Sequence, residues 1–177
     1  MTRTSALKTV HVLSEDLQFV KESVYDKCGL DLVNFSRNPE GADYDACCFM
    51  LDGKSVQYRA SRITPTKSGQ FVAIWKRNKE GITEPFNVID GIDFIIITSK
   101  KSVNFGQFIF PKTVLAERGV MTLSGKEGKR GIRVYPPWDK PENKQAGQTQ
   151  LWQKEFFVSM KGDKPTDLNL LKRLLEW

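Results

Sequence analysis

The chain has 177 residues, of which 40% are hydrophobic and 11% aromatic, so it can bury a core and is not a disordered or collagen-like chain. No apolar run approaches the ~20 residues that a membrane-spanning helix needs, and we expect no contact with a membrane. The first residues lack the apolar stretch of a secretory signal. Three cysteines, Cys28, Cys47 and Cys48, favour reduced thiols in a cytoplasmic protein over a disulfide framework.

The net charge of +6 is unevenly distributed along the chain. Residues 53–79 contain seven Lys or Arg and no Asp or Glu, and residues 100–133 carry a net charge of +6. The rest of the chain therefore sums to −7. If the two basic windows meet in space they form a basic face, which favours an anionic partner. The alternative is that these cations are solvated residues on strand edges.

In the first half of the chain the sequence predicts a helix and a β-hairpin after a lead-in over residues 1–12. Ser14 is a good N-cap, apolar residues at helical spacing continue to Cys28, and Gly29 can end the helix. Residues 34–43 are predicted to form a loop. Strands are predicted over residues 45–51 and 55–63, joined by a two-residue turn at Asp52-Gly53.

The second half alternates strands with short helices. The predicted strands cover residues 70–77, 93–99, 104–110 and 132–135, and the turn between the first two covers residues 78–85. Helices are predicted over residues 112–118 and 149–160 and after Thr166, so that residues 149–176 pack on the sheet as C-terminal helices. We therefore expect one α/β (α+β) domain over residues 1–177, with a single central mixed sheet flanked by helices.

Patterns for catalysis are weak in this sequence. His11 is the single histidine, the cysteines lack zinc-ligand spacing, and no phosphate-binding glycine loop is present, so we expect no cofactor and no metal. A metal-dependent hydrolase needs an acid on the strand that returns from the predicted hairpin, and Ala60 stands at that position. Such an enzyme would have to use Asp45 with Glu40 or Asp43, and it remains an alternative hypothesis.

The residues with the strongest functional pattern are basic, aromatic and amide-bearing. Arg and Lys bind phosphate, hydroxyl groups add hydrogen bonds, and exposed aromatic rings stack on bases. The candidate nucleic-acid-binding residues are Arg59, Arg62, Thr64, Lys67, Gln70, Lys76, Arg77, Lys112, Lys129, Arg130, Arg133 and Trp138. Trp138 is expected to be exposed because it follows two prolines, whereas Trp75 and Trp152 are expected to pack in the core. Arg59 and Arg62 could instead pair with Glu40, Asp43 or Asp45.

Four segments together resemble the MepB family. They are Tyr58–Arg77, Gly106–Lys112, Gly128–Trp138 and Gln150–Gln153, and they follow one another in the order that the family shows. Ser61-Arg62 departs mildly from the usual Ala-Lys step of the family and keeps the charge. The resemblance implies a compact α/β domain similar to the restriction-endonuclease-like core, and nucleic-acid binding without an established enzymatic activity.

The favoured hypothesis is therefore a non-catalytic, cytoplasmic domain that binds nucleic acid, DNA in particular, through its phosphate backbone and largely independently of sequence. The hydrolase with a degenerate site is one alternative. A second alternative is a regulatory or adaptor protein whose basic windows bind an acidic partner.

Overall fold

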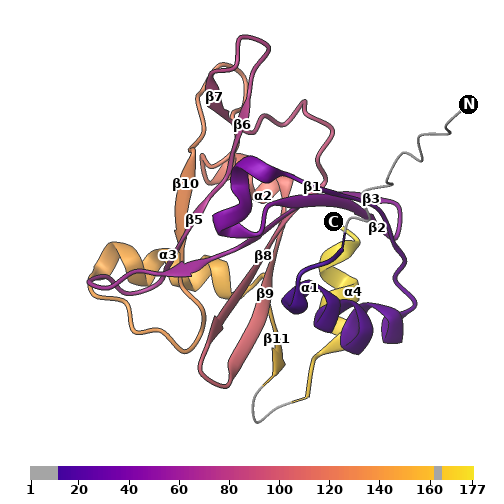
Figure 1. Cartoon of the computed structure of the whole chain (residues 1–177). Helices are drawn as coiled ribbons and strands as arrows, with labels where there is room; N and C mark the ends of the chain where they lie inside the picture. Colours follow the sequence, from indigo (N-terminus) through magenta and orange to yellow (C-terminus); the bar gives the residue numbers. More distant parts are fainter. Residues whose placement is uncertain (1–11, 162–164) are drawn as a thin grey trace, which may run out of the picture.

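A six-stranded mixed sheet forms the centre of the protein, which is described here from a computed structural model over residues 12–161 and 165–177 (Figure 1). Its strand order is β1-β2-β3-β8-β9-β11, and only the β3–β8 pair is parallel. The strands are β1 (Leu32–Arg37), β2 (Cys47–Leu51), β3 (Lys54–Ala60), β8 (Phe94–Lys101), β9 (Asn104–Pro111) and β11 (Phe157–Lys161). This sheet and the helices confirm the predicted fold class.

The chain between β3 and β8 forms the strands of two smaller sheets, and one of these sheets also includes β10 from later in the chain. A three-stranded antiparallel sheet has the order β10-β5-β4, and β6 pairs with β7 in a hairpin. Their bounds are β4 (Arg62–Ile63), β5 (Gln70–Ala73), β6 (Trp75–Arg77), β7 (Thr83–Pro85) and β10 (Gly131–Val134). The parallel β3–β8 pairing is possible because this long excursion brings the chain back in the same direction.

The helices are short and carry the expected caps. They are α1 (Glu15–Val20), the π-helical turn η1 (Lys21–Tyr25), the 3₁₀ turns η2 (Asp26–Cys28) and η3 (Pro39–Tyr44), α2 (Lys112–Glu117), α3 (Lys144–Lys154) and α4 (Leu168–Leu175). The Ser14 side chain accepts from the backbone N–H of Leu17 at 3.3 Å, and Gly29 closes η2 with φ 69°. The predicted first helix is thus confirmed in position, although it continues as π and 3₁₀ turns.

The structure corrects the prediction in several places. The strand predicted over residues 70–77 is two strands, β5 and β6, in different sheets, and the turn predicted over residues 78–85 ends in β7, which pairs with β6. Residues 32–37 form β1 where a loop was expected from residue 34 onward. The helix predicted over residues 149–160 is wrong at both ends: α3 begins at Lys144, ends at Lys154, and gives way to β11, which pairs with β9. The last helix begins after Asp167, whose side chain accepts from the backbone N–H of Leu170, and not after Thr166. The predicted lead-in lies outside the described residues apart from Val12.

The long strand predicted over residues 55–63 changes sheets at Ser61. Its backbone N–H still donates to Thr98 of the large sheet at 2.9 Å, and the next residue already pairs with β5. The Ser61 hydroxyl lies 2.6 Å from the Ser99 hydroxyl and donates to Gln70 Oε1 at 2.7 Å. These buried hydrogen bonds hold the small sheet against the large one, because a buried polar group without a partner would be costly.

Helix α3 is joined to the outer edge of β10 by one buried amide. Gln153 is 1% exposed; it accepts from the backbone N–H of Tyr135 at 2.8 Å and donates to the carbonyl of Arg133 at 2.9 Å. The side chain therefore satisfies the two backbone groups that a neighbouring strand would otherwise bind.

Replacing Gln153 with alanine (Q153A) is expected to lower the free energy of unfolding by about 2 kcal/mol, since it leaves two partly buried backbone groups without their partner. Urea denaturation measures the change. Gln148→Ala, on the exposed face of the same helix, should stay within about 0.5 kcal/mol of the wild type. Equal midpoints for the two variants would mean that Gln153 does not hold α3 on β10.

Cys28, Cys47 and Cys48 all carry free thiols. In the part of the chain that the structure describes, no helix is both long and apolar enough to cross a membrane.

Candidate nucleic-acid interface

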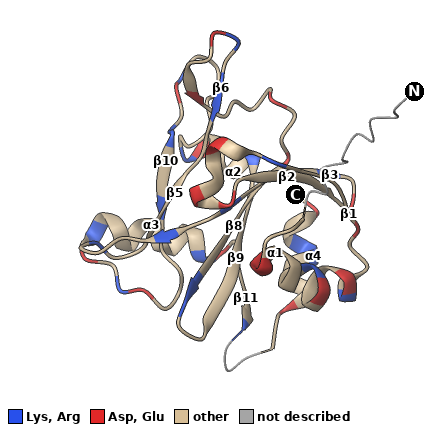
Figure 2. Cartoon of the chain, viewed as in Figure 1, with Lys and Arg blue, Asp and Glu red and all other residues tan. Residues whose placement is uncertain are grey.

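The two basic windows meet in the three-stranded sheet. β5 comes from the first window and β10 from the end of the second, and Arg62 and Arg133 both stand opposite Phe71. Directly opposed residues of antiparallel strands project from the same face. Arg62, Phe71 and Arg133 therefore form one row across the sheet, which we call the arginine row. Figure 2 shows Lys and Arg positions spread along β10 and the neighbouring strands.

The row faces away from the core. Val72, Ile132 and Val134, which alternate with the row along β5 and β10, are buried on the opposite face. Arg62 is exposed and Arg133 half-buried. The period-2 alternation of the strands thus separates an apolar inner face from a cationic outer face.

Neither arginine of the row is bound to a carboxylate in the described residues. Arg62 Nε donates to the backbone carbonyl of Asp43 at 2.5 Å. Arg133 donates from Nη2 to the Thr64 hydroxyl at 2.7 Å and from Nη1 to the Ser68 carbonyl at 3.1 Å. All these acceptors are neutral, so neither guanidinium group is held in an ion pair within the described residues.

The loop between β4 and β5 presents Lys67 beside the row. Arg133 holds both ends of this loop through Thr64 and Ser68, and the Ser68 N–H also donates to the Glu142 carboxylate. Gly69 has φ 72°, and a Cβ there would lie 2.7 Å from the Tyr135 ring. The loop is therefore held in place at its base, while Lys67 is exposed at its tip and has no partner among the residues the structure describes.

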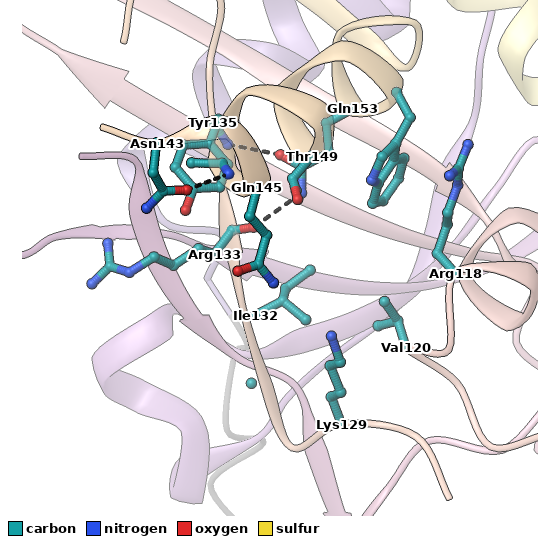
Figure 3. A pocket seen from close by; sticks show the side chains of 13 residues that line it. Arg118, Val120, Lys129, Ile132, Arg133, Tyr135, Asn143, Gln145, Thr149 and Gln153 are labelled. Carbon is teal, nitrogen blue, oxygen red and sulfur yellow. Dashed lines mark hydrogen bonds between the residues drawn. The ribbon is translucent and has the colours of Figure 1, made fainter. Parts of the chain in front are cut away.

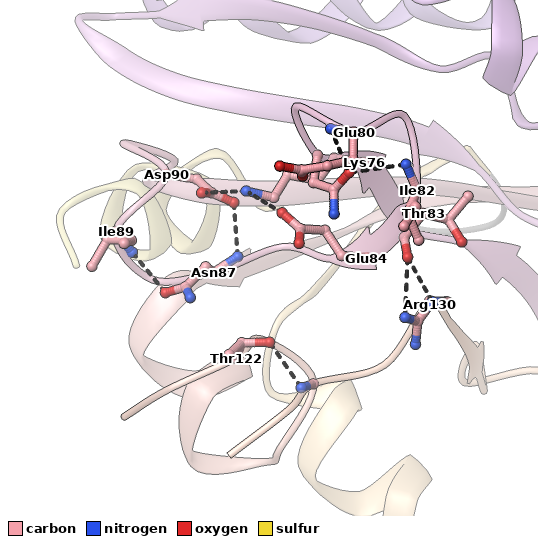
Figure 4. A network of polar contacts seen from close by, with 12 residues as sticks. Lys76, Glu80, Ile82, Thr83, Glu84, Asn87, Ile89, Asp90, Thr122 and Arg130 are labelled. Carbon is pink, nitrogen blue, oxygen red and sulfur yellow. Dashed lines mark hydrogen bonds and ion pairs between the residues drawn. The ribbon is translucent and has the colours of Figure 1, made fainter. Parts of the chain in front are cut away.

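Three predicted cations are bound to carboxylates and contribute less to a basic face. Figure 4 shows the two ion pairs of Lys76. Lys76 Nζ lies 2.6 Å from Asp90 and 3.2 Å from Glu84. Partial burial alone would lower the pKa of Lys76, but the hydrogen bonds to these two carboxylates outweigh it and raise the pKa. Similar ion pairs join Arg77 to Glu40 at 2.7 Å and Arg130 to Glu127 at 2.9 Å.

Three other predicted residues are taken into the interior. Gln70 is 1% exposed and completes the hydrogen bonds around Ser61. Arg59 is 3% exposed, and burial lowers its pKa to about 10. Trp138 was expected to be exposed but is half-buried, with its ring 5.5 Å from that of Phe157 in an edge contact. The two prolines before it turn the chain but do not keep the ring in solvent.

Lys112 and Lys129 lie outside the row in different places. Lys112 begins α2, beside Val88 and Leu123. Lys129 lines a cavity of about 380 Å³ between β10 and α3 (Figure 3). No Asp or Glu lines that cavity. Arg118, which was not among the candidates, also lines it and places its guanidinium 5.1 Å from the centre of the Trp152 ring. The charge window contained Arg118, but only the fold brings it to Lys129.

The acids of the alternative hydrolase hypothesis lie near the start of β2. Asp45 is 3.0 Å from Arg37, and Glu40 is bound to Arg77. Asp45, Ala60 and Arg62 line a shared cavity of about 330 Å³. Within residues 12–161 and 165–177, no group of three or more His, Cys, Asp or Glu side chains is arranged to hold a metal ion.

The chain belongs to the MepB-like family, whose model matches residues 38–159 and so spans η3 through most of β11. Among solved structures, the chain is similar to a crystal structure of MepB. The two are 32% identical, the match covers 75% of this chain and 89% of that chain, and the TM-score is 0.71. No protein with curated annotation matches the chain. The arginine row, with its loop, lies inside the matched region.

Proposed function

We propose that this protein is a non-catalytic nucleic-acid-binding domain that contacts the phosphate backbone through the arginine row and Lys67. One observation carries the proposal: Arg62 and Arg133, from separate basic windows, share one outward face and donate only to neutral acceptors. Guanidinium groups pair with phosphate oxygens in a bidentate way, and the Thr64 hydroxyl adds a polar group at the same place. Phe71, between the two arginines, offers an aromatic surface.

The proposed partner is DNA, bound largely without regard to sequence. Contacts to phosphate fix the position of a protein on a duplex but carry no sequence information. The row lies on a face of the short three-stranded sheet. The proposed contact is therefore made by side chains of strands and not by a helix placed in a groove of DNA. We place the protein in the cytoplasm, because its three thiols are free.

A mobility-shift titration with two duplexes of unrelated sequence tests this function. If the three cations neutralise three phosphates, the logarithm of the binding constant should fall with the logarithm of salt concentration with a slope of about −3. Both duplexes should give the same slope and similar affinities. Absence of any retardation at low salt would reject the proposal, and a large difference between the duplexes would reject sequence independence.

The nuclease-like alternative rests on the cavity that Asp45 shares with Ala60 and Arg62. Under this alternative, Ala60 stands where a restriction-endonuclease-like core would place a metal-binding acid. Incubation of plasmid with the protein and Mg²⁺ or Mn²⁺ distinguishes the two functions. Cleavage that Asp45→Ala abolishes would favour the hydrolase, whereas binding without cleavage supports phosphate contacts by the arginine row and Lys67.

A further inference from the structure

Arg59 is a buried cation without a carboxylate partner. It extends from β3 and is 3% exposed. Its Nη1 donates to the carbonyl of Tyr58 at 2.7 Å and to Gln57 Oε1 at 3.4 Å, and its guanidinium lies 5.6 Å from the centre of the Phe86 ring. All three neighbours are neutral. A buried charge without a counter-charge is costly, and proteins usually pair it or use it.

Arg59 is also one of the residues that line a small cavity. Arg59 lines a space of about 160 Å³ together with Tyr44, Ala73 and Trp75. The Nε and Nη2 atoms of Arg59 donate to no described residue. They are not fully enclosed either, because among the described residues only Nε1 of Trp138 is both fully enclosed and without a partner. The two free Arg59 nitrogens are therefore reached by solvent, and they offer two parallel N–H groups to whatever enters the cavity.

The same cavity also carries acceptors. Asp43 and Glu40 line it, but both Glu40 oxygens accept from Arg77 Nε, at 2.7 and 2.8 Å. The Asp43 carboxylate has no partner among the described residues and is exposed. A simple oxyanion would be attracted by Arg59 and repelled by Asp43. A neutral planar ligand with acceptors on one edge and donors on the next fits both groups.

We propose that this cavity receives one unpaired guanine base of the bound nucleic acid, an inference that rests on the proposed function. Arg59 donates from Nε and Nη2 to O6 and N7, the bidentate contact by which arginine most often recognises guanine. Asp43 accepts from the N1–H and the 2-amino group, while Tyr44 and Trp75 provide aromatic walls. Cavities of about 150 Å³ hold a single aromatic ring, so a base fits with part of it at the opening, and a whole nucleotide does not.

The cavity is linked to the arginine row by two contacts of its lining residues. The Tyr44 ring packs edge-on against Phe71 of the row, with 6.1 Å between ring centres. The backbone carbonyl of Asp43 accepts from Arg62 Nε at 2.5 Å. A strand whose phosphates lie on the row therefore passes the mouth of the cavity, and one of its unpaired bases can turn inward.

Fluorescence anisotropy with single-stranded dT oligomers tests the inference. Each oligomer carries one central dG, 7-deaza-dG, deoxyinosine or dA. For the wild-type protein the dG oligomer should bind at least about fivefold more tightly than the dA oligomer. Removing N7 or the 2-amino group should each weaken the preference. Equal affinities for all four oligomers would overturn the guanine pocket and leave the phosphate contacts of the arginine row standing. No binding of any oligomer would also overturn the guanine pocket, and the proposed function would fall with it only if the two duplexes of the mobility-shift titration failed to bind as well.

Two variants assign the contacts. Arg59→Met should bring the ratio of dG to dA affinity close to one, and its melting temperature should equal or exceed that of the wild type, because a buried unpaired charge is replaced by an apolar chain. Asp43→Ala, at an exposed position, should make dG and deoxyinosine bind equally. The assignment would be overturned if Arg59→Met kept the wild-type preference for dG. It would also be overturned if Asp43→Ala kept the wild-type difference between dG and deoxyinosine. Arg62→Glu should weaken all four oligomers alike.

Discussion

Reversing the charges of Arg62 and Lys67 together (R62E/K67E) is expected to weaken binding to duplex DNA on the order of a hundredfold at low salt. The double variant removes two exposed cations of the proposed surface and places two carboxylates there instead. Arg62 donates to a backbone carbonyl and Lys67 to no described residue, so no internal ion pair is lost. A mobility-shift titration against two unrelated duplexes measures the effect, which should be the same for both.

A matched double variant separates this local effect from a change in net charge. Lys27→Glu and Lys172→Glu alter the net charge of the protein by the same amount, but they lie on η2 and α4, on the side of the molecule away from β5 and β10 (Figure 1). This control should lose only the small, long-range part of the attraction, which salt screens. If both double variants bound DNA equally well, the arginine row would not be the binding surface.

The largest effect on stability is expected from a substitution in the sheet core, Gly106→Ala. Gly106 lies on β9 opposite Ser159, where β11 comes close. A Cβ at this position would collide with the Phe157 ring and would lie 2.5 Å from the Val158 carbonyl oxygen. Backbone on both strands has to move apart, so we expect the free energy of unfolding to fall by about 3 kcal/mol or more. Denaturant unfolding followed by circular dichroism measures it.

Gly147→Ala is the control of opposite sign. Gly147 lies within α3, and a Cβ there would meet only the Pro141 side chain at 4.0 Å. Alanine in a helix interior is more stable than glycine by roughly 0.5–1 kcal/mol, so this variant should unfold at a higher denaturant concentration than the wild type. Destabilisation by Gly147→Ala, or a neutral Gly106→Ala, would contradict the packing described.

Local signals predicted those elements that are stabilised by local interactions. The Asp52-Gly53 turn joins β2 to β3 with φ values of 48° and 77°, as an aspartate-glycine pair in a hairpin predicts. The β-branched run in β8 is a central strand, buried on both faces. Ser14 caps α1. In each case the residues that determine the structure lie within a few positions of one another.

The missed elements depend on partners that are distant in the sequence. β1 has no fully buried residue and is irregular, with Asn34 at φ 56° and a register shift in its pairing with β2, so it lacks the alternation of a regular strand. α3 buries the amides Gln150 and Gln153 instead of an apolar stripe. Hydrophobic spacing therefore does not give its correct bounds. β11 becomes a strand because β9 offers it an edge beside Gly106.

The candidate site was predictable as a set of charges but not as a surface. The two basic windows could be identified from composition, and that they meet follows from the pairing of β10 with β5. Which cations are available depends on where single carboxylates lie: Asp90 and Glu84 bind Lys76, and Glu40 binds Arg77. Spacing along the chain carries no information about such pairs. It also gave no sign that Arg59 would be enclosed.

The way in which Gln153 binds β10 also bears on self-association. An open strand edge is a template on which a second chain can add a strand, and natural proteins block such edges. Here one side-chain amide occupies the carbonyl of Arg133 and the N–H of Tyr135, at the end of the strand. An extended peptide can extend this sheet along its full length only after α3 has moved away. Loss of the glutamine would therefore expose a surface prone to aggregation beside the proposed DNA contact.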